Sequence, residues 1–309
     1  MKSPVRTLIA ASLFAAGLVG GSLAFAQAAA QAAYVEGVQM PAWVERNGVK
    51  QPLAAGAALQ AGDKISTGAD SRLLLRMSEG SQVKLGENAL FNVSSLASRS
   101  ENKQTVLTAA LEVARGAFRF TTDAKNKLTS KRDVTVRFAT VTAGIRGTDL
   151  WGKSAGDRDI VCLIEGDIGV QRDGDAEFRM NQALQFYITP KTADNKVDRS
   201  KPAPQVVPVP IEKLQEWATE TDIGQGKGAA TKGGKWKVVF ASAPIQDAAL
   251  GVYDNLRANG YAAEIHPRRA GAQRLYEVRI SGLPSKAEAE ALGSKLSGLA
   301  GVDAPRATL

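Results

Sequence analysis

Few residues of this chain could carry out covalent chemistry, and they lie far apart in the sequence. The 309 residues include one cysteine, Cys162, and one histidine, His266. Cys162 stands in an apolar run, 160–164, that is typical of a buried strand, whereas a catalytic thiol needs an activating base beside it. Ser-His-Asp chemistry, Cys-His chemistry and a Cys/His zinc site would all depend on these two residues. The sequence therefore predicts a non-enzymatic protein with no catalytic residue, no metal site and no cofactor.

Two short motif matches do not change this prediction. Residues 224–228 contain three glycines and Lys227, but their spacing fits neither phosphate-binding pattern, and the segment leads into an expected strand rather than a helix. Ser100 and Lys103 match the start of a penicillin-binding pattern, but no convincing partner motif follows. Nucleotide binding and acyl transfer are therefore not expected.

The residues best suited to bind a ligand lie in a repeated pattern near the C-terminus. Each copy has a short apolar strand, a turn and an amphipathic helix, and the two copies are 40 residues apart. The matching positions are Val238, Pro244, Ala249 and Leu256 in the first copy and Val278, Pro284, Ala289 and Leu296 in the second. Two copies favour one pseudo-symmetric domain over a longer array.

The elements expected in this domain, residues 235–309, follow the order βαββαβ, the ferredoxin-like arrangement of an α+β fold. Strands are expected at 236–241, 261–266, 274–281 and near 301–304, and the first helix at 244–258. Ser285 and Glu288 predict a capping box at the start of the second helix. Both helices must cover the same sheet face to bury their apolar stripes, so the opposite face is left open for a ligand.

Two strands of the domain predict five residues on that open face. They are Lys237, Val239, Glu277, Arg279 and Ser281. Sugar recognition combines a few polar groups with apolar contact, and this set offers both. One exposed face is also normal in an antiparallel sheet, so a merely solvated surface remains the alternative.

Residues 34–190 predict an all-β domain, a roll or sandwich of short strands joined by Gly-rich turns. Apolar residues alternate with polar ones at Leu73, Leu75 and Met77, at Phe118 and Phe120, and at Val134, Val136 and Phe138. Alternation with period two places one face of each strand in a core and the other in water.

Residues 191–234 predict a linker with one short helix. Four prolines between 201 and 210 favour an extended, semi-rigid spacer. Ile211, Leu214 and Trp217 then stand at helical spacing, and this helix is expected to pack on the β-domain. The Gly- and Lys-rich residues 224–235 predict a flexible, solvated hinge.

The N-terminus has the pattern of a secretory signal peptide, residues 1–26. Lys2 and Arg6 precede an apolar run, and Ala24-Phe25-Ala26 predicts cleavage after Ala26. The mature chain is then periplasmic, and no later segment is long and apolar enough to span a membrane. The whole chain carries a net charge of +8, and removal of Lys2 and Arg6 leaves +6. This charge favours an anionic envelope partner, while export argues against nucleic acid.

The C-terminal residues resemble the SPOR (sporulation-related repeat) family between 236 and 305. The matching positions are Trp236, Val238, Ala249, Leu256, Gly260, Tyr261, Tyr276, Val278, Gly282 and the run 287–292. The resemblance implies binding of peptidoglycan, particularly glycan strands stripped of stem peptides, often at the division septum. The family often has Gln where Val239 stands, Gly at Ala241 and an aromatic residue at Ala243. Arg279, the repeat-mate of Val239, offers a compensating polar group.

Motifs at 62–68, 79–85, 116–119 and 142–148, followed by Glu165-Gly166, resemble the FecR domain between about 59 and 170. Members of that family relay a receptor signal across the inner membrane to a sigma factor. This chain has a signal peptide where their cytoplasmic segment and anchor would be, so a direct sigma-factor role is not expected.

The sequence thus predicts a periplasmic peptidoglycan-binding protein of the cell envelope. Its SPOR-like domain holds glycan strands on the open sheet face, and its FecR-like domain is a binding or scaffold module for an envelope protein. The alternative is a signalling or receptor-contacting regulator that the wall module only localises. A role in cell division at the septum follows from the SPOR resemblance alone.

Overall fold

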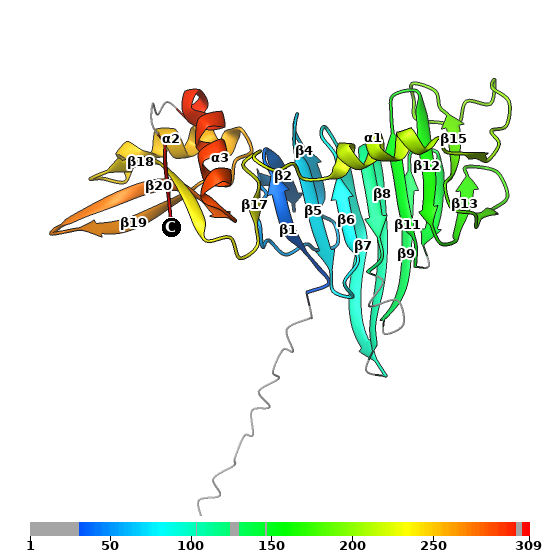
Figure 1. The fold of residues 1–309 in the computed structure, drawn as a ribbon, viewed down its shortest axis with the longest axis horizontal. Helices are drawn as coiled ribbons and strands as arrows, with labels where there is room; N and C mark the ends of the chain where they lie inside the picture. Colours follow the sequence, from blue (N-terminus) through cyan, green and yellow to red (C-terminus); the bar gives the residue numbers. More distant parts are fainter. Residues whose placement is uncertain (1–30, 103, 124–129, 146, 301–304) are drawn as a thin grey trace, which may run out of the picture.

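Two domains follow one another along the chain, a large β-domain and a smaller domain of strands and helices (Figure 1). The computed structural model describes residues 31–102, 104–123, 130–145, 147–300 and 305–309. The expected signal peptide, 1–26, and the strand expected near 301–304 lie outside the described residues. No helix in the described part of the chain is both long and apolar enough to cross a membrane.

The first layer of the β-domain is antiparallel throughout. In order across the layer it contains β17 (Ala230–Thr231), β1 (Ala33–Gln39), β5 (Arg72–Met77), β6 (Gln82–Leu85), β8 (Gln104–Thr121), β11 (Asp149–Ser154), β12 (Arg158–Glu165), β15 (Gln185–Pro190) and β16 (Val207–Pro208). Two of its strands, β16 and β17, come from the segment predicted as linker. These four residues of the predicted linker are therefore part of the β-domain's sheet.

The second layer shares β8 with the first. Across it lie β3 (Val49–Pro52), β2 (Ala42–Arg46), β4 (Lys64–Thr67), β7 (Leu90–Glu101), β8, β9 (Ser130–Phe138), β10 (Val141–Ile145), β13 (Ile168–Arg172) and β14 (Phe178–Met180). Only the β8–β9 pair is parallel among these pairings of described residues.

Strand β8 changes layers at Gly116. Its N-terminal part pairs with β7 and β9, and its part from Gly116 onward pairs with β6 and β11. Gly116 has a φ of 94°, and a Cβ there would lie 2.7 Å from Ala89. Since only glycine tolerates both the positive φ and this approach, Gly116 lets one long strand join the two layers.

The alternating apolar residues fill the space between the layers, as predicted. Phe118 of the first layer stacks on Phe91 of the second, with ring centroids 6.0 Å apart. It also meets Phe138 edge-on at 6.3 Å. Leu73, Leu75, Met77, Val83, Leu85, Phe120, Val134 and Val136 are likewise buried. The alternation predicted these faces correctly because each strand has one side in the core.

Helix α1 (Ile211–Thr221) packs back on the β-domain, which confirms the prediction from its helical spacing. The Trp217 ring lies 4.4 Å from the Trp151 ring at an interplanar angle of 5°. Two ion pairs hold the helix end, Lys84 to Asp222 at 2.6 Å and Lys153 to Glu220 at 2.8 Å.

The C-terminal domain consists of β18 (Trp236–Ala243), α2 (Asp247–Ala258), β19 (Glu264–Ala270), β20 (Gln273–Leu283), α3 (Lys286–Ala300) and β21 (Arg306–Thr308). Its four strands are antiparallel and stand in the order β19-β20-β18-β21. The last strand lies just beyond the range predicted for it, and β19 begins and ends later than predicted. The β19–β20 hairpin extends away from the β-domain (Figure 1).

Removing the ring that holds α1 should destabilise the β-domain. Trp217→Ala is expected to lower the free energy of unfolding by about 2 to 4 kcal/mol, because it deletes a half-buried ring and its aromatic stack. Urea unfolding measures this difference. The control is Gln215→Ala, an exposed position on the same helix, which should change stability by less than about 0.5 kcal/mol. Equal stability of the two variants would contradict a packed α1.

Candidate functional site

The two long helices of the C-terminal domain cover one face of its sheet (Figure 1). Their buried side chains, Ala249, Leu256, Ala289, Leu292 and Leu296, join Val238, Val278 and Ile280 of the central strands in one core. Side chains on the other face of β18 and β20 point away from the helices because successive residues of a strand alternate. This second face contains the five predicted site residues.

Strand register brings the predicted residues together. Lys237 pairs with Ser281, and Val239 pairs with Arg279. Glu277 lies two residues before Arg279 on the same side of β20. A register shift between Val239 and Ala241 leaves Phe240 as the extra residue of a bulge in β18. All five predicted residues therefore share one face of the two central strands.

The five residues differ in how much of their surface is available. Val239 is only 4% exposed and Glu277 only 5%. Glu277 also forms an ion pair with Arg268 of β19 at 3.3 Å. The polar groups that a ligand can reach are thus mainly those of Lys237, Arg279 and Ser281, while Val239 forms part of the floor.

Glu264 of β19 belongs to the same face and was not among the predicted residues. Its Oε1 accepts hydrogen bonds from Arg279 Nε at 2.8 Å and from Ser281 Oγ at 2.9 Å. Burial works against ionisation of Glu264, but these two hydrogen bonds outweigh it and lower its pKa. The carboxylate is therefore charged at neutral pH and fixes the Arg279 guanidinium in place.

The sequence contained only part of the signal for Glu264. Glu264 lies within the predicted second strand, so the sequence predicts that it belongs to the sheet. Its pairing with Arg279 depends on the register of the β19–β20 hairpin, which the pattern does not give.

Only one of the two hydrogen bonds of the predicted capping box is present, so the prediction is wrong for the other. The backbone N–H of Glu288 does bond Ser285 Oγ, at 3.2 Å. The Glu288 carboxylate instead accepts bonds from the N–H groups of Gly226, Gly228 and Ala229 at 2.6, 2.7 and 3.1 Å. Three backbone donors in a Gly-rich loop form a nest that outcompetes the single N-cap donor. The glycines that suggested a phosphate loop thus wrap a carboxylate of the protein itself.

Segment 224–235 is not the solvated hinge that its composition predicts. Gly224 N donates to Gln39 Oε1 at 3.3 Å, and β17 pairs with β1 through Gly37 and Val38. A Cβ at Gly228 would lie 2.8 Å from Leu292 of α3. The segment therefore contacts both domains along its length.

The two domains also touch directly. Ala42 N donates to the Gly260 carbonyl at 3.2 Å, and a Cβ at Gly260 would lie 2.5 Å from the Trp43 ring. Lys295 of α3 donates to the Met40 carbonyl at 3.3 Å. The buried side chains of both domains form one continuous core cluster. The domains are thus docked rather than merely tethered.

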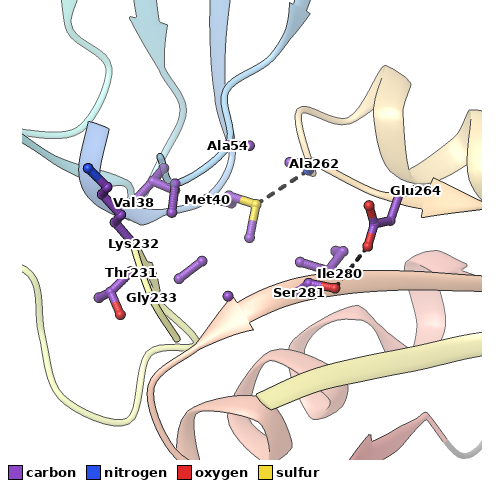
Figure 2. A pocket seen from close by; sticks show the side chains of 13 residues that line it. Val38, Met40, Ala54, Thr231, Lys232, Gly233, Ala262, Glu264, Ile280 and Ser281 are labelled. Atoms are coloured by element: carbon purple, nitrogen blue, oxygen red, sulfur yellow. Dashed lines mark hydrogen bonds between the residues drawn. The ribbon is translucent and has the colours of Figure 1, made fainter. Parts of the chain in front are cut away.

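A cleft of about 270 Å³ lies where the domains meet (Figure 2). The β-domain contributes Val38, Met40 and Ala54, and the C-terminal domain contributes Glu264 and Ser281. The hydrogen bond between Ser281 and Glu264 lies at its edge (Figure 2). The candidate face and this cleft therefore share two side chains.

Cys162 and His266, the two residues considered for catalysis, lie in different domains and do not form a Cys-His pair. Cys162 is fully buried in β12, and burial raises the pKa of its thiol to about 12. His266 is exposed on β19, opposite Glu277. Among the described residues no group of three His, Cys, Asp or Glu side chains could hold a metal ion.

Comparison with known families assigns both domains. Residues 63–169 match the family model described as FecR protein, and residues 232–304 match the model described as SPOR domain. The chain carries a FecR domain followed by a SPOR domain. Both resemblances seen in the sequence are thereby confirmed, and neither family is enzymatic.

Comparison with individual proteins adds little. None of the curated proteins matches the chain. Two crystal structures of a candidate anti-sigma factor from Parabacteroides distasonis ATCC 8503 are similar at 13% identity and a TM-score of 0.36. They cover 77% and 75% of this chain, and 91% of their own chains in each case. At these values the likeness supports no inference.

The nest around Glu288 should control how tightly the interdomain segment is held. Glu288→Gln removes the charge from three hydrogen bonds and is expected to weaken the docking of 224–229 by about 2 kcal/mol. Trypsin should then cut at Lys227 at least about tenfold faster. Glu290→Gln is the matched control, since Glu290 is exposed on the same helix and pairs only with Lys286 among the described residues. Equal cleavage of both variants would show that the nest does not hold the segment.

Proposed function

We propose that this is a non-enzymatic periplasmic peptidoglycan-binding protein whose SPOR domain holds glycan strands on its open sheet face. The observation that carries the proposal is the SPOR match at 232–304, combined with a helix-free sheet face that presents Lys237, Arg279 and Ser281. The strand order and directions support a ferredoxin-like arrangement for this domain. The FecR domain acts as a binding or scaffold module for an envelope protein.

The chemistry of the face suits a polysaccharide. Hydroxyl and amide groups of a sugar find donors in Lys237 and Arg279 and an acceptor in Glu264. Val239 stands at the position where the family often has Gln, and at 4% exposure it forms a buried apolar base for this row of polar side chains. A few fixed polar groups around an apolar contact are typical of carbohydrate and other small-ligand sites.

Electrostatics suits the binding of a stripped strand. Removal of the stem peptide by an amidase frees the lactyl carboxylate of each muramic acid, so a stripped strand is a polyanion. The whole chain carries +8, and the chain without residues 1–26 carries +6. Arg306 of β21 pairs with Val239 and extends the row that begins with Glu264 and Arg279. A cationic surface attracts an anionic polymer and raises its local concentration.

The FecR match favours the alternative function, a signalling or receptor-contacting regulator that the wall module localises. In that case removal of glycan binding would leave the partner interaction of the β-domain intact. The two functions differ in what depends on the open face, so the same variants distinguish them.

Arg279→Ala should weaken binding to stripped sacculi by about tenfold or more, because it deletes a fixed, charge-bearing donor. A pelleting assay with the full chain and amidase-treated sacculi measures the change. Lys237→Ala should show a smaller loss, since its ammonium already donates to the Leu309 backbone oxygen.

Arg274→Ala is the matched control for this assay. Arg274 is an exposed arginine of β20 but lies on the opposite side of the strand from Arg279. It should bind like the wild type. An equal loss of binding in Arg274→Ala and Arg279→Ala would show that the interaction is only non-specific charge attraction. No loss of binding in either variant would exclude the open face as the site.

A further inference from the structure

The interdomain cleft has walls from three parts of the chain (Figure 2). The β-domain supplies Val38, Met40 and Ala54, and the interdomain segment supplies Thr231 and Lys232. The SPOR domain supplies Ala262, Glu264, Ile280 and Ser281. No part of the cleft would exist in the shape seen without the docking of both domains.

The open face of the SPOR sheet leads into this cleft. Ser281 pairs with Lys237 and Glu264 pairs with Arg279, so both residues stand in the rows of the candidate face. The same two side chains line the cleft. The face therefore leads toward the β-domain into the cleft, whose other wall contains Met40 and Ala54.

The cleft combines an apolar wall with polar groups at its edge. Ala54, Ala55 and Ala262 offer apolar contact, while Val38, Met40 and Ile280 line the cleft as buried residues. Glu264 uses Oε1 for its bonds to Arg279 and Ser281, and none of the hydrogen bonds among the described residues engages its Oε2. Lys232 is exposed, with its ammonium 3.7 Å from the centroid of the Tyr34 ring. One acceptor and one cation thus flank an apolar surface.

We propose that this cleft binds the terminal N-acetylated sugar of a peptidoglycan strand, a subsite that rests on the proposed function of the open face. The acetamido methyl group and the apolar side of the sugar ring contact the small side chains of Ala54 and Ala262, next to the buried Met40. Glu264 Oε2 accepts a bond from a sugar hydroxyl, and Lys232 attracts the free lactyl carboxylate. Small-ligand pockets usually measure roughly 300 to 1,000 Å³. A volume of about 270 Å³ therefore suits one sugar residue rather than several.

The consequence is that the protein recognises strand ends as well as strand interiors. Interior sugars contact only the open face, whereas a terminal sugar also contacts the β-domain. The affinity for a short stripped oligosaccharide, which consists largely of ends, should therefore depend on the cleft much more than the affinity for a sacculus does.

The test blocks the cleft from the β-domain side. Ala54→Trp places a large ring into it from an exposed position. Val49→Trp adds the same ring on the same domain at a site that is 65% exposed and does not line the cleft. Calorimetry of the full chain with a stripped tetrasaccharide of alternating N-acetylglucosamine and N-acetylmuramic acid should show at least about tenfold weaker binding for Ala54→Trp. Val49→Trp should bind like the wild type.

A second readout needs no substitution. In protein labelled with ¹³C-methyl methionine, the Met40 methyl signal should shift when the tetrasaccharide saturates the wild type. The signals of Met77 and Met180, which are buried in the β-domain away from the cleft, should not. An unchanged affinity of Ala54→Trp, or an unmoved Met40 signal at saturation, overturns the terminal subsite.

Pelleting of the same proteins with stripped sacculi separates this inference from the proposed function. If the wild type pellets with sacculi but either readout fails, the open face remains the binding site and the terminal subsite is excluded. Wild type that binds neither sacculi nor tetrasaccharide overturns both.

Discussion

The arrangement of the whole molecule depends on how residues 224–234 bind both domains at once. On one side β17 adds to the edge of the β-domain through β1. On the other side the Glu288 carboxylate gathers three backbone N–H groups of the same segment. An added strand and a charge-assisted nest each fix backbone groups, so the segment has little freedom between its two attachments. The SPOR sheet therefore faces solvent in one fixed direction relative to the β-domain.

This constraint gives the β-domain a part in ligand binding that its own fold does not suggest. With a flexible tether the two domains would act separately, and the SPOR face would have open ends. With the docked arrangement, Met40 and Ala54 form a wall at one end of the face, beside Glu264 and Ser281. At the other end the β19–β20 hairpin projects freely (Figure 1). The binding surface is thus closed at the β-domain and open at the hairpin.

The sequence was informative wherever structure follows from local periodicity. Alternation placed Leu73, Leu75 and Phe118 in the core, and helical spacing placed Trp217 against the β-domain, because both patterns depend only on neighbours along the chain. It also placed the five predicted site residues on one face of two adjacent strands. The role of those residues in binding stays a prediction.

What the sequence could not supply were contacts between distant segments. The register of the β19–β20 hairpin places Glu264 beside Arg279, and Val239 is buried although it stands on the open face. Segment 224–235 has the composition of a free hinge, yet its glycines are needed for close approach to α3 and for the nest around Glu288. Composition measures the freedom of an isolated segment and not the partners available to it after folding.

The most direct test of the central claim, that glycan strands bind the open SPOR face, is a backbone amide NMR titration of the full chain with stripped glycan oligosaccharides. The expected result is a set of shifts on β18 and β20 around Lys237, Arg279 and Ser281, with the outward surfaces of α2 and α3 unchanged. Shifts confined to the helices or to the far end of the β-domain would contradict the account.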